Sequence, residues 1–231
     1  VLRFLMADED LQPIKGMSDL GPPDIEAWQF LEATARDVFR CYGFSEIRTP
    51  ILEKISVFTR SLGDNTDVVQ KEMYTLTSRD GKEQYALRPE GTAPICRASV
   101  EHGMHREPQP QKLFTIAPMY RYGAPGKGRY REHWQASVEA IGSAEPALDA
   151  ELIQLYDTLL GCLGVTAYHL ELNSIGCRAC RPAYLGALRA WLDANLDRLD
   201  AGTREKALAS PLRVFDNCLA KPEHVRTALD E

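Results

Sequence analysis

The sequence predicts an α+β fold in which antiparallel strand pairs alternate with amphipathic helices, followed by a small helical module at the C-terminal end. Three observations predict it. Residues 111–142 alternate in polarity as the arms of a hairpin do, and residues 25–42 repeat apolar side chains every three or four positions. The sequence after Gly176 is charged and helical in pattern, unlike what precedes it. We therefore divide the chain into a core, 1–176, and a helical module, 177–231.

Composition limits the class of protein. The chain has 231 residues, 27 basic and 33 acidic, with a net charge of -6 and a hydrophobic share of 44%. This balance is normal for a globular protein and argues against a broadly positive, nucleic-acid-coating surface. The six cysteines are scattered, the first residues become acidic too early for a signal peptide, and no apolar run approaches the roughly 20 residues of a membrane span. We expect a cytoplasmic protein without membrane association.

The first predicted element is the helix over residues 25–42, which Pro22 and Pro23 precede and Gly43 ends. Its apolar stripe consists of Trp28, Leu31, Ala35, Val38 and Phe39. A strand and a turn follow. The strand ends at Pro50, because proline lacks the N–H that a central strand position needs.

A second hairpin is predicted from the strands 73–77 and 85–89, since Asp80-Gly81 between two β-like runs favours a tight turn. A helix follows, with Thr92 as its N-cap. Glu90 lies on the bend between strand and helix. An exposed turn carboxylate and a binding group displayed on a bend are both open interpretations of this residue.

The second arm of the 111–142 hairpin places polar side chains on one face and mostly apolar ones on the other. The polar positions are Arg129, Arg131, His133, Gln135, Ser137 and Glu139. The turn of this hairpin gathers four cations in an acidic chain, namely Arg121, Lys127, Arg129 and Arg131. This local cluster favours a polyanionic ligand, and a solvated face of an ordinary antiparallel sheet is the alternative.

A helix within residues 143–165 and a strand over residues 168–176 complete the predicted core. Cys177 and Cys180 have metal-ligand spacing, but a zinc site needs about four ligands. Only Cys218 and His224 remain to supply the others. We favour two free thiols near a helix start over structural zinc, and we predict no metal site in the protein.

Four segments are informative in combination. They are LRPEGTA at 87–93, APMYR at 117–121, GRYREHWQASVEAIG at 128–142 and LELNSIGC at 170–177. Together they resemble the catalytic domain of bacterial histidyl-tRNA synthetases. The opening KGMSDLGP and the helix–strand unit ending at Pro50 resemble the N-terminal segment and class II motif 1 of that family.

The resemblance implies a class II synthetase fold, an antiparallel sheet flanked by helices, that works as a homodimer through the motif 1 region. It implies activation of histidine with ATP and Mg²⁺ to histidyl-adenylate, and then transfer to tRNA(His). It also assigns residues by motif position: Arg121 to catalysis and ATP binding, Arg129 to ATP binding, and Glu90, Thr92, Gln135 and Glu139 to histidine binding.

The sequence departs from the family pattern in two places. The family usually has a glutamate two positions after the motif 2 arginine and another arginine directly after it, and Gly123 and Ala124 stand at these two positions. The sequence also ends at Glu231, before motif 3 and the anticodon-binding domain, so we expect a truncated synthetase. One alternative is the histidine-sensing regulatory subunit of ATP phosphoribosyltransferase, a synthetase paralogue. Another is a dimerisation or RNA-binding module without catalysis.

Overall fold

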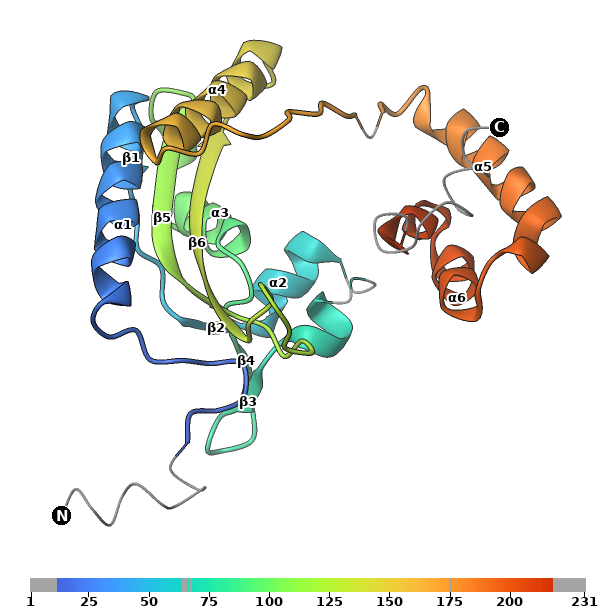
Figure 1. Ribbon diagram of the computed structural model, residues 1–231, viewed down its shortest axis with the longest axis horizontal. Helices are drawn as coiled ribbons and strands as arrows, with labels where there is room; N and C mark the ends of the chain where they lie inside the picture. Colours follow the sequence, from blue (N-terminus) through green and yellow to red (C-terminus); the bar gives the residue numbers. More distant parts are fainter. Residues whose placement is uncertain (1–11, 64–65, 67, 175, 218–231) are drawn as a thin grey trace. The chain divides into compact units, whose positions relative to one another are not determined.

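The computed structural model describes residues 12–63, 66, 68–174 and 176–217 (Figure 1). The chain divides into two compact units, residues 1–168 and residues 169–231. The first unit holds both sheets, and the described part of the second is helical. The α+β prediction is confirmed. The functional division at residues 176 and 177 stays a prediction.

In its described part, the first unit is built from two three-stranded sheets and four α-helices. In chain order these elements are α1 (Asp24–Cys41), β1 (Ser45–Glu46), β2 (Leu52–Lys54), α2 (Ile55–Leu62), the π-helical turn η3 (Val68–Glu72), β3 (Thr75–Thr77), β4 (Gln84–Leu87), α3 (Thr92–Glu101), the 3₁₀ turn η4 (Met104–Arg106), β5 (Gln111–Tyr120), β6 (Glu132–Ile141) and α4 (Pro146–Cys162).

The β5–β6 hairpin is the longest pairing in the described structure. Its strands run antiparallel over ten residue pairs, from Gln111 opposite Ile141 to Tyr120 opposite Glu132. The short strand β1 joins the other side of β5 in parallel. A second sheet has the antiparallel order β2-β4-β3, in which β3 and β4 form the hairpin predicted around Asp80-Gly81.

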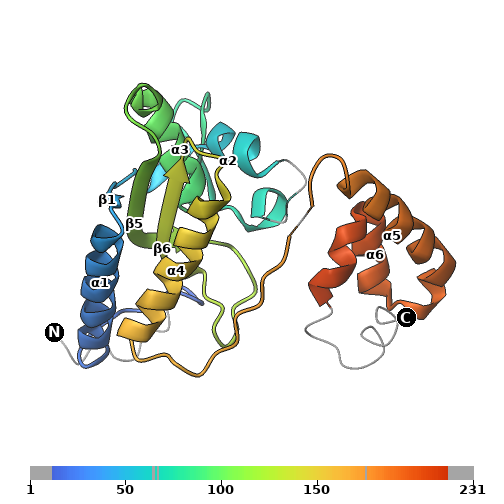
Figure 2. The same cartoon turned by 90° about the horizontal axis from the view of Figure 1, so that it is seen from above.

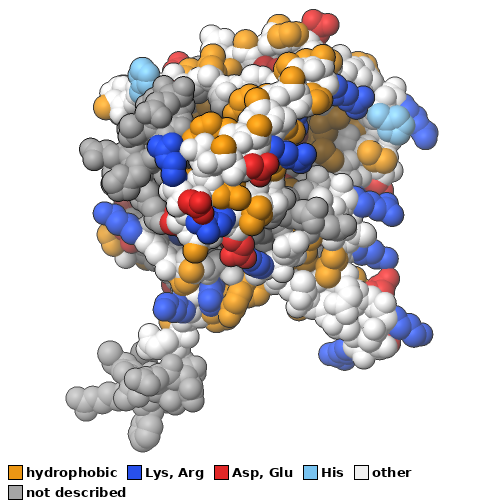
Figure 3. Space-filling model, turned by 90° about the vertical axis from the view of Figure 1, so that its right-hand side faces the viewer, with side chains coloured by type: hydrophobic (Ala, Val, Ile, Leu, Met, Phe, Trp, Pro, Cys, Tyr) orange, Lys and Arg blue, Asp and Glu red, His pale blue; other side chains and the backbone are white. Residues whose placement is uncertain are grey.

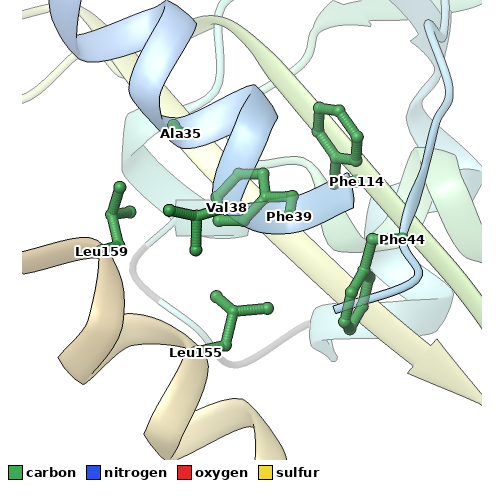
Figure 4. Close-up of a cluster of buried hydrophobic side chains, with 7 residues drawn as sticks. All are labelled: Ala35, Val38, Phe39, Phe44, Phe114, Leu155 and Leu159. Carbon is green, nitrogen blue, oxygen red and sulfur yellow. The ribbon is translucent and has the colours of Figure 1, made fainter. Parts of the chain in front are cut away.

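Helices cover the two faces of the β5–β6 hairpin: α1 and α4 lie on one face, and α3 lies on the other (Figure 2). The core between the hairpin and helices α1 and α4 consists of Ala35, Val38, Phe39, Phe44, Phe114, Leu155 and Leu159 (Figure 4). The rings of Phe39 and Phe114 meet edge to face, with centroids 5.1 Å apart. The apolar side chains of β6 that pack against this core are Ala136, Val138 and Ala140. The alternation in the sequence therefore predicted the inward face of β6 correctly.

Two predicted elements are wrong. Residues 55–58, which we expected in the turn that follows the strand ending at Pro50, form the first half of helix α2 (Ile55–Leu62). Phe58 explains the difference, because its fully buried ring packs into a separate cluster with Ala86 and Ala93, and this tertiary contact outweighs the β-like composition. Residues 168–174 form no strand in the described structure. A strand requires a neighbour for its N–H and C=O groups, and no described strand pairs with this segment.

The second unit consists of α5 (Arg181–Asn195), η5 (Leu196–Arg198), α6 (Ala201–Ala209) and η6 (Pro211–Asn217) in its described part. Its own core contains Leu188, Leu192, Leu199, Ala207 and Val214. The carboxylate of Asp200 caps α6 by accepting the N–H of Thr203 at 3.2 Å. This unit therefore has a hydrophobic core of its own, and its helix α6 is capped by a residue of the same unit.

The surface in Figure 3 shows lysine and arginine side chains dispersed among acidic and apolar ones. The cations do not form one broad basic field on this face, in agreement with the composition. Among the described residues, no helix is both long enough and apolar enough to cross a bilayer.

Removing the Phe39 ring tests the core described above. Phe39 on helix α1 is fully buried. We predict that Phe39→Ala lowers the free energy of unfolding by about 3–5 kcal/mol, because it leaves a cavity in a packed core. The matched change is Val100→Ala on helix α3, whose side chain is 69% exposed, and it should stay within about 0.5 kcal/mol. Urea unfolding followed by circular dichroism measures both values. Equal losses would contradict the assignment of α1's buried face.

Candidate functional site

The candidate site begins at the bend between β4 and α3. Arg88, which is 4% exposed, fixes this bend by donating from Nε to the carbonyl of Pro118 at 3.0 Å and from Nη1 to that of Thr49 at 2.8 Å. Burial lowers the pKa of the Arg88 guanidinium. Arg88 was not among the predicted site residues. Its contacts join the bend to β5, so it positions Glu90 relative to the hairpin.

Glu90 caps helix α3. Its buried carboxylate accepts the backbone N–H of Thr92 at 2.6 Å and that of Ala93 at 2.9 Å. The prediction that Thr92 is the N-cap is wrong: Gly91 occupies that position, and Thr92 is the first helical residue. A side chain cannot replace Gly91 freely, because a Cβ there would lie 2.7 Å from Ser137 Oγ. Gly91 therefore permits the start of α3 to lie close to β6.

Thr92 connects this helix to β6. Its hydroxyl donates to Glu139 Oε1 at 2.6 Å. Burial is the main cause of the raised pKa of Glu139; the nearby carboxylate of Glu90 adds to it, and the hydrogen bond from Thr92 opposes it. Burial, and then the charges of the same two carboxylates, raise the pKa of the Cys96 thiol. Two acidic groups with limited hydration therefore lie near each other at the start of α3, where a cationic ligand group would be favoured.

A cavity of about 310 Å³ adjoins these residues. It is lined by Thr92, Gln135, Ala136, Ser137, Val138, Glu139 and Tyr156. Three of the four predicted histidine-binding residues therefore line one cavity, and the fourth, Glu90, accepts the backbone N–H of Thr92, one of the lining residues. Volume and lining suit a small polar molecule that carries hydrogen-bond donors.

Tyr156 belongs to this cavity although the sequence did not single it out. Its hydroxyl donates to the carbonyl of Ala136 at 2.9 Å, and its ring packs edge to face on Phe39. Burial and the neighbouring Glu139 raise the pKa of the Tyr156 phenol. The sequence of α4 does not mark Tyr156 as a site residue, so only the fold could reveal that it reaches the edge of β6.

Arg121 lies at the other end of the polar face. Its Nε donates to the carbonyl of Pro89 at 2.8 Å, which connects the hairpin to the residue before Glu90. Burial and then the charge of Arg121 lower the pKa of His133. Among the described residues, no carboxylate lies within ion-pair distance of the Arg121 guanidinium. Its positive charge is therefore available to an anionic ligand.

The other cations of the turn have different surroundings. Arg129 pairs with Glu72 at 2.6 Å, and the guanidinium of Arg131 stacks on the Tyr122 ring at 4.2 Å from its centroid. Lys127 is exposed. A Cβ at Gly123 would lie 3.2 Å from Nε of Arg129. Beside Arg121, the turn thus holds the stacked Arg131, the paired Arg129 and the exposed Lys127. The partner carboxylate Glu72 was not identified from the sequence.

The residues considered as zinc ligands fall into two groups. Cys177 and Cys180 are both exposed and unbridged, and Cys218 and His224 lie outside the described residues. In the part of the chain that the structure describes, no three or more His, Cys, Asp or Glu side chains gather as a metal site would require.

Comparisons with known proteins give one family. A family model described as "Histidyl-tRNA synthetase" matches residues 16–210. The chain is 45% identical over 203 residues to the histidine--tRNA ligase of Syntrophotalea carbinolica, covering 88% of this chain and 48% of that protein. It is 49% identical over 203 residues to that of Anaeromyxobacter dehalogenans, with the same shares. The chain therefore spans about half the length of these curated relatives.

A solved structure agrees with the sequence comparison. The apo histidyl-tRNA synthetase of Staphylococcus aureus superposes with a TM-score of 0.68 at 30% identity, covering 95% of this chain and 54% of that one. A Bacillus halodurans structure titled as an ATP phosphoribosyltransferase regulatory subunit/histidyl-tRNA synthetase has a TM-score of 0.58 at 24% identity over 68% of this chain and 39% of that one. This second likeness concerns the fold alone.

The raised pKa of Glu139 predicts how stability varies with pH. The folded chain binds this proton more tightly than the unfolded chain, so stability is lost as pH rises from the ordinary glutamate range through the raised value. Glu139→Gln removes this loss and keeps an acceptor for Thr92. We predict that the variant gains stability relative to the parent chain between pH 4 and pH 8.

Urea unfolding at each pH measures this difference in the free energy of unfolding. Glu107→Gln is the matched control, because Glu107 is exposed, and its difference from the parent chain should stay flat. A flat difference for Glu139→Gln as well would contradict the buried, weakly hydrated environment assigned to this carboxylate.

Proposed function

The chain belongs to the histidyl-tRNA synthetase family, and on that premise we propose that its polar cavity and adjacent arginine activate histidine as histidyl-adenylate. The observation that supports this most is the arrangement around the Arg88–Thr92 bend. The carbonyl of Pro89, in this bend, accepts a hydrogen bond from Arg121. In the next residues of the bend, Glu90 accepts the N–H of Thr92, and the Thr92 hydroxyl donates to Glu139. One short segment thus connects a cation for phosphate with carboxylates for an amino acid.

In the proposed reaction the carboxylate of histidine attacks the α-phosphorus of ATP, an acyl phosphate bond forms, and pyrophosphate leaves. The carboxylate is already a nucleophile at neutral pH, so the protein's task is to orient it and neutralise charge. Arg121 suits this task because its planar guanidinium can bridge two oxygens of one or both reactants. Arg129, at the solvent side of the turn, is proposed to contact the remaining phosphates after exchanging its bond to Glu72.

The cations fit ATP, whereas the described carboxylates do not form a metal site of their own. Mg²⁺ commonly binds through substrate phosphates with few protein ligands. When bound with ATP, the ion would supply further neutralisation of the phosphate oxygens. The chain's own contribution is the arginine side chains and their fixed positions.

Histidine recognition is proposed for Glu90, Thr92, Gln135 and Glu139. The carboxylates can accept hydrogen bonds from the α-ammonium group or from a ring N–H, and the Gln135 amide can pair with either imidazole nitrogen. A cavity that is built around such partners disfavours ligands that leave them unpaired, by factors that apolar contacts alone do not reach. This chemistry would separate histidine from amino acids of similar size.

The remaining parts of the proposal concern partners. We propose tRNA(His) as acceptor of the histidyl group and a cytoplasmic location, as protein biosynthesis requires. A homodimer through the motif 1 region is proposed around helix α1 and β1. The exposed side chains of Phe30 and Leu31 on α1 support it, because a second copy would shield this apolar surface from water.

A second candidate is the histidine-sensing regulatory subunit of ATP phosphoribosyltransferase. Gly123 and Ala124 favour it, since neither offers the carboxylate expected near the adenine ring. Against it, Glu72 brings a carboxylate to the same turn, 2.6 Å from Arg129. ATP binding separates the two functions: a ligase binds histidine and ATP, and a histidine sensor binds histidine alone.

The test of the proposed function is amino-acid-dependent exchange of pyrophosphate into ATP by this chain, with each of the twenty amino acids. The ligase proposal expects exchange with histidine and with no other amino acid. Histidine binding in the same preparation without ATP binding would replace the ligase proposal with the sensor. Exchange with a different amino acid would refute the assigned specificity.

Arg121→Ala tests the role of the arginine. We predict that it lowers histidine-dependent exchange by about 10²–10³-fold, as expected for losing one charge-stabilising donor at the reacting phosphate. Arg121→Lys should recover only a small part, because an ammonium lacks the bidentate fork. The control is Arg79→Ala at an exposed turn, which should leave exchange unchanged. Normal exchange by Arg121→Ala, with the fold checked by circular dichroism, would contradict the role.

A further inference from the structure

Two cysteines outside the proposed site face each other in the second unit. Cys177 and Cys180 lie in the turn that leads into α5, and their Sγ atoms are 3.5 Å apart. Both residues are exposed. The distance is a contact between unbonded sulfurs, and a disulfide bond would shorten it to about 2.05 Å.

The backbone of the turn holds this pair. The N–H of Cys177 donates to Sγ of Cys180 at 3.1 Å, and the N–H of Arg181 donates to the carbonyl of Cys177 at 2.9 Å. Gly176 has a φ of +74°, and a Cβ there would lie 3.0 Å from Sγ of Cys180. A glycine immediately before the pair thus permits both the left-handed backbone and the position of the second sulfur.

The two thiols are not equivalent. Hydrogen bonds from the backbone N–H groups of Cys180 and Ala179, and then from the Cys180 side chain, lower the pKa of Cys177. The sequence adds Arg178 and Arg181 beside the pair. A thiolate is the reactive form of cysteine, and cations and helix starts favour it. The lowered pKa of Cys177 favours this residue as the attacking thiolate, and Cys180, whose Sγ lies 3.5 Å from that of Cys177, is placed to attack whatever bonds to it.

We propose that Cys177 and Cys180 form a redox-active dithiol that exchanges reversibly with low-molecular-weight disulfides such as oxidised glutathione. The Cys177 thiolate attacks one sulfur of the disulfide, the S–S bond breaks, and one thiolate leaves. Cys180 then loses its proton and attacks Cys177, forming the Cys177–Cys180 bond and releasing the second thiolate. One external disulfide is reduced to two thiols while the protein loses two hydrogens.

The proposal does not depend on the proposed ligase function. It needs only the turn before α5, and it assigns to this turn a modification that would respond to the thiol balance of the surroundings. The pair is also distinct from the other exposed cysteines, Cys41 and Cys162, for which no cysteine contact is found among the described residues.

The experiment equilibrates the reduced chain in glutathione buffers of graded ratio, quenches with acid, alkylates the remaining thiols and maps them by mass spectrometry. We expect one intramolecular bond between Cys177 and Cys180, complete at a ratio that leaves Cys41 and Cys162 alkylated. The initial alkylation rate of Cys177 should exceed that of Cys41 by about tenfold at neutral pH. In urea, the equilibrium constant for closing the bond should fall, because the turn no longer holds the sulfurs together.

Variants separate the two roles. Cys180→Ser should leave Cys177 as a stable mixed disulfide with glutathione, and Cys177→Ser should slow the first attack. Cys41→Ser is the matched control and should change neither result. The proposal is overturned if no Cys177–Cys180 bond forms at any ratio, or if it forms equally well in urea. Stoichiometric zinc that protects both thiols in the purified chain would also overturn it.

Discussion

The antiparallel pairing of β5 with β6 is the constraint on which the first unit depends. Because side chains alternate along a strand, one register sends Phe114, Val138 and Ala140 toward α1 and α4. The same register turns Gln135 and Glu139 toward the cavity beside α3. A shift by one residue would exchange the two sets, placing polar groups in the core and apolar ones in the cavity. The core thus selects the register, and the register assembles the candidate site.

The bend before α3 shows how one residue can serve the fold and a ligand. Glu90 accepts hydrogen bonds from two backbone N–H groups at the start of α3. These bonds stabilise the folded chain in the absence of ligand. A bound ammonium group would have to share this carboxylate with the helix. Glu139 differs, since its hydroxyl partner Thr92 can rotate away, and its raised pKa reports the poor hydration that an incoming cation would relieve.

The local sequence pattern was sufficient to predict the long elements, and it was insufficient to predict the short ones. Helix α1 and the β5–β6 hairpin have many periodic positions, so the buried Ala35 and Phe39 could be predicted from spacing. Helix α2 could not, since its formation follows the burial of Phe58 against residues distant in sequence. The resemblance named Gln135 and Glu139, whereas Glu72 and Tyr156 enter the site only through tertiary contacts. The expected strand at residues 168–174 lacked a described neighbour, which no local pattern reveals.

The central claim is that the polar face of β6 and the start of α3 form a histidine site on this chain. Titration calorimetry of histidine into the chain, repeated with Gln135→Ala and Glu139→Gln, tests it most directly. The account predicts saturable binding of histidine, no binding of the other amino acids, and affinity losses of at least about tenfold, or 1.4 kcal/mol, in each variant. Absence of histidine binding, or binding that both variants preserve, would contradict it.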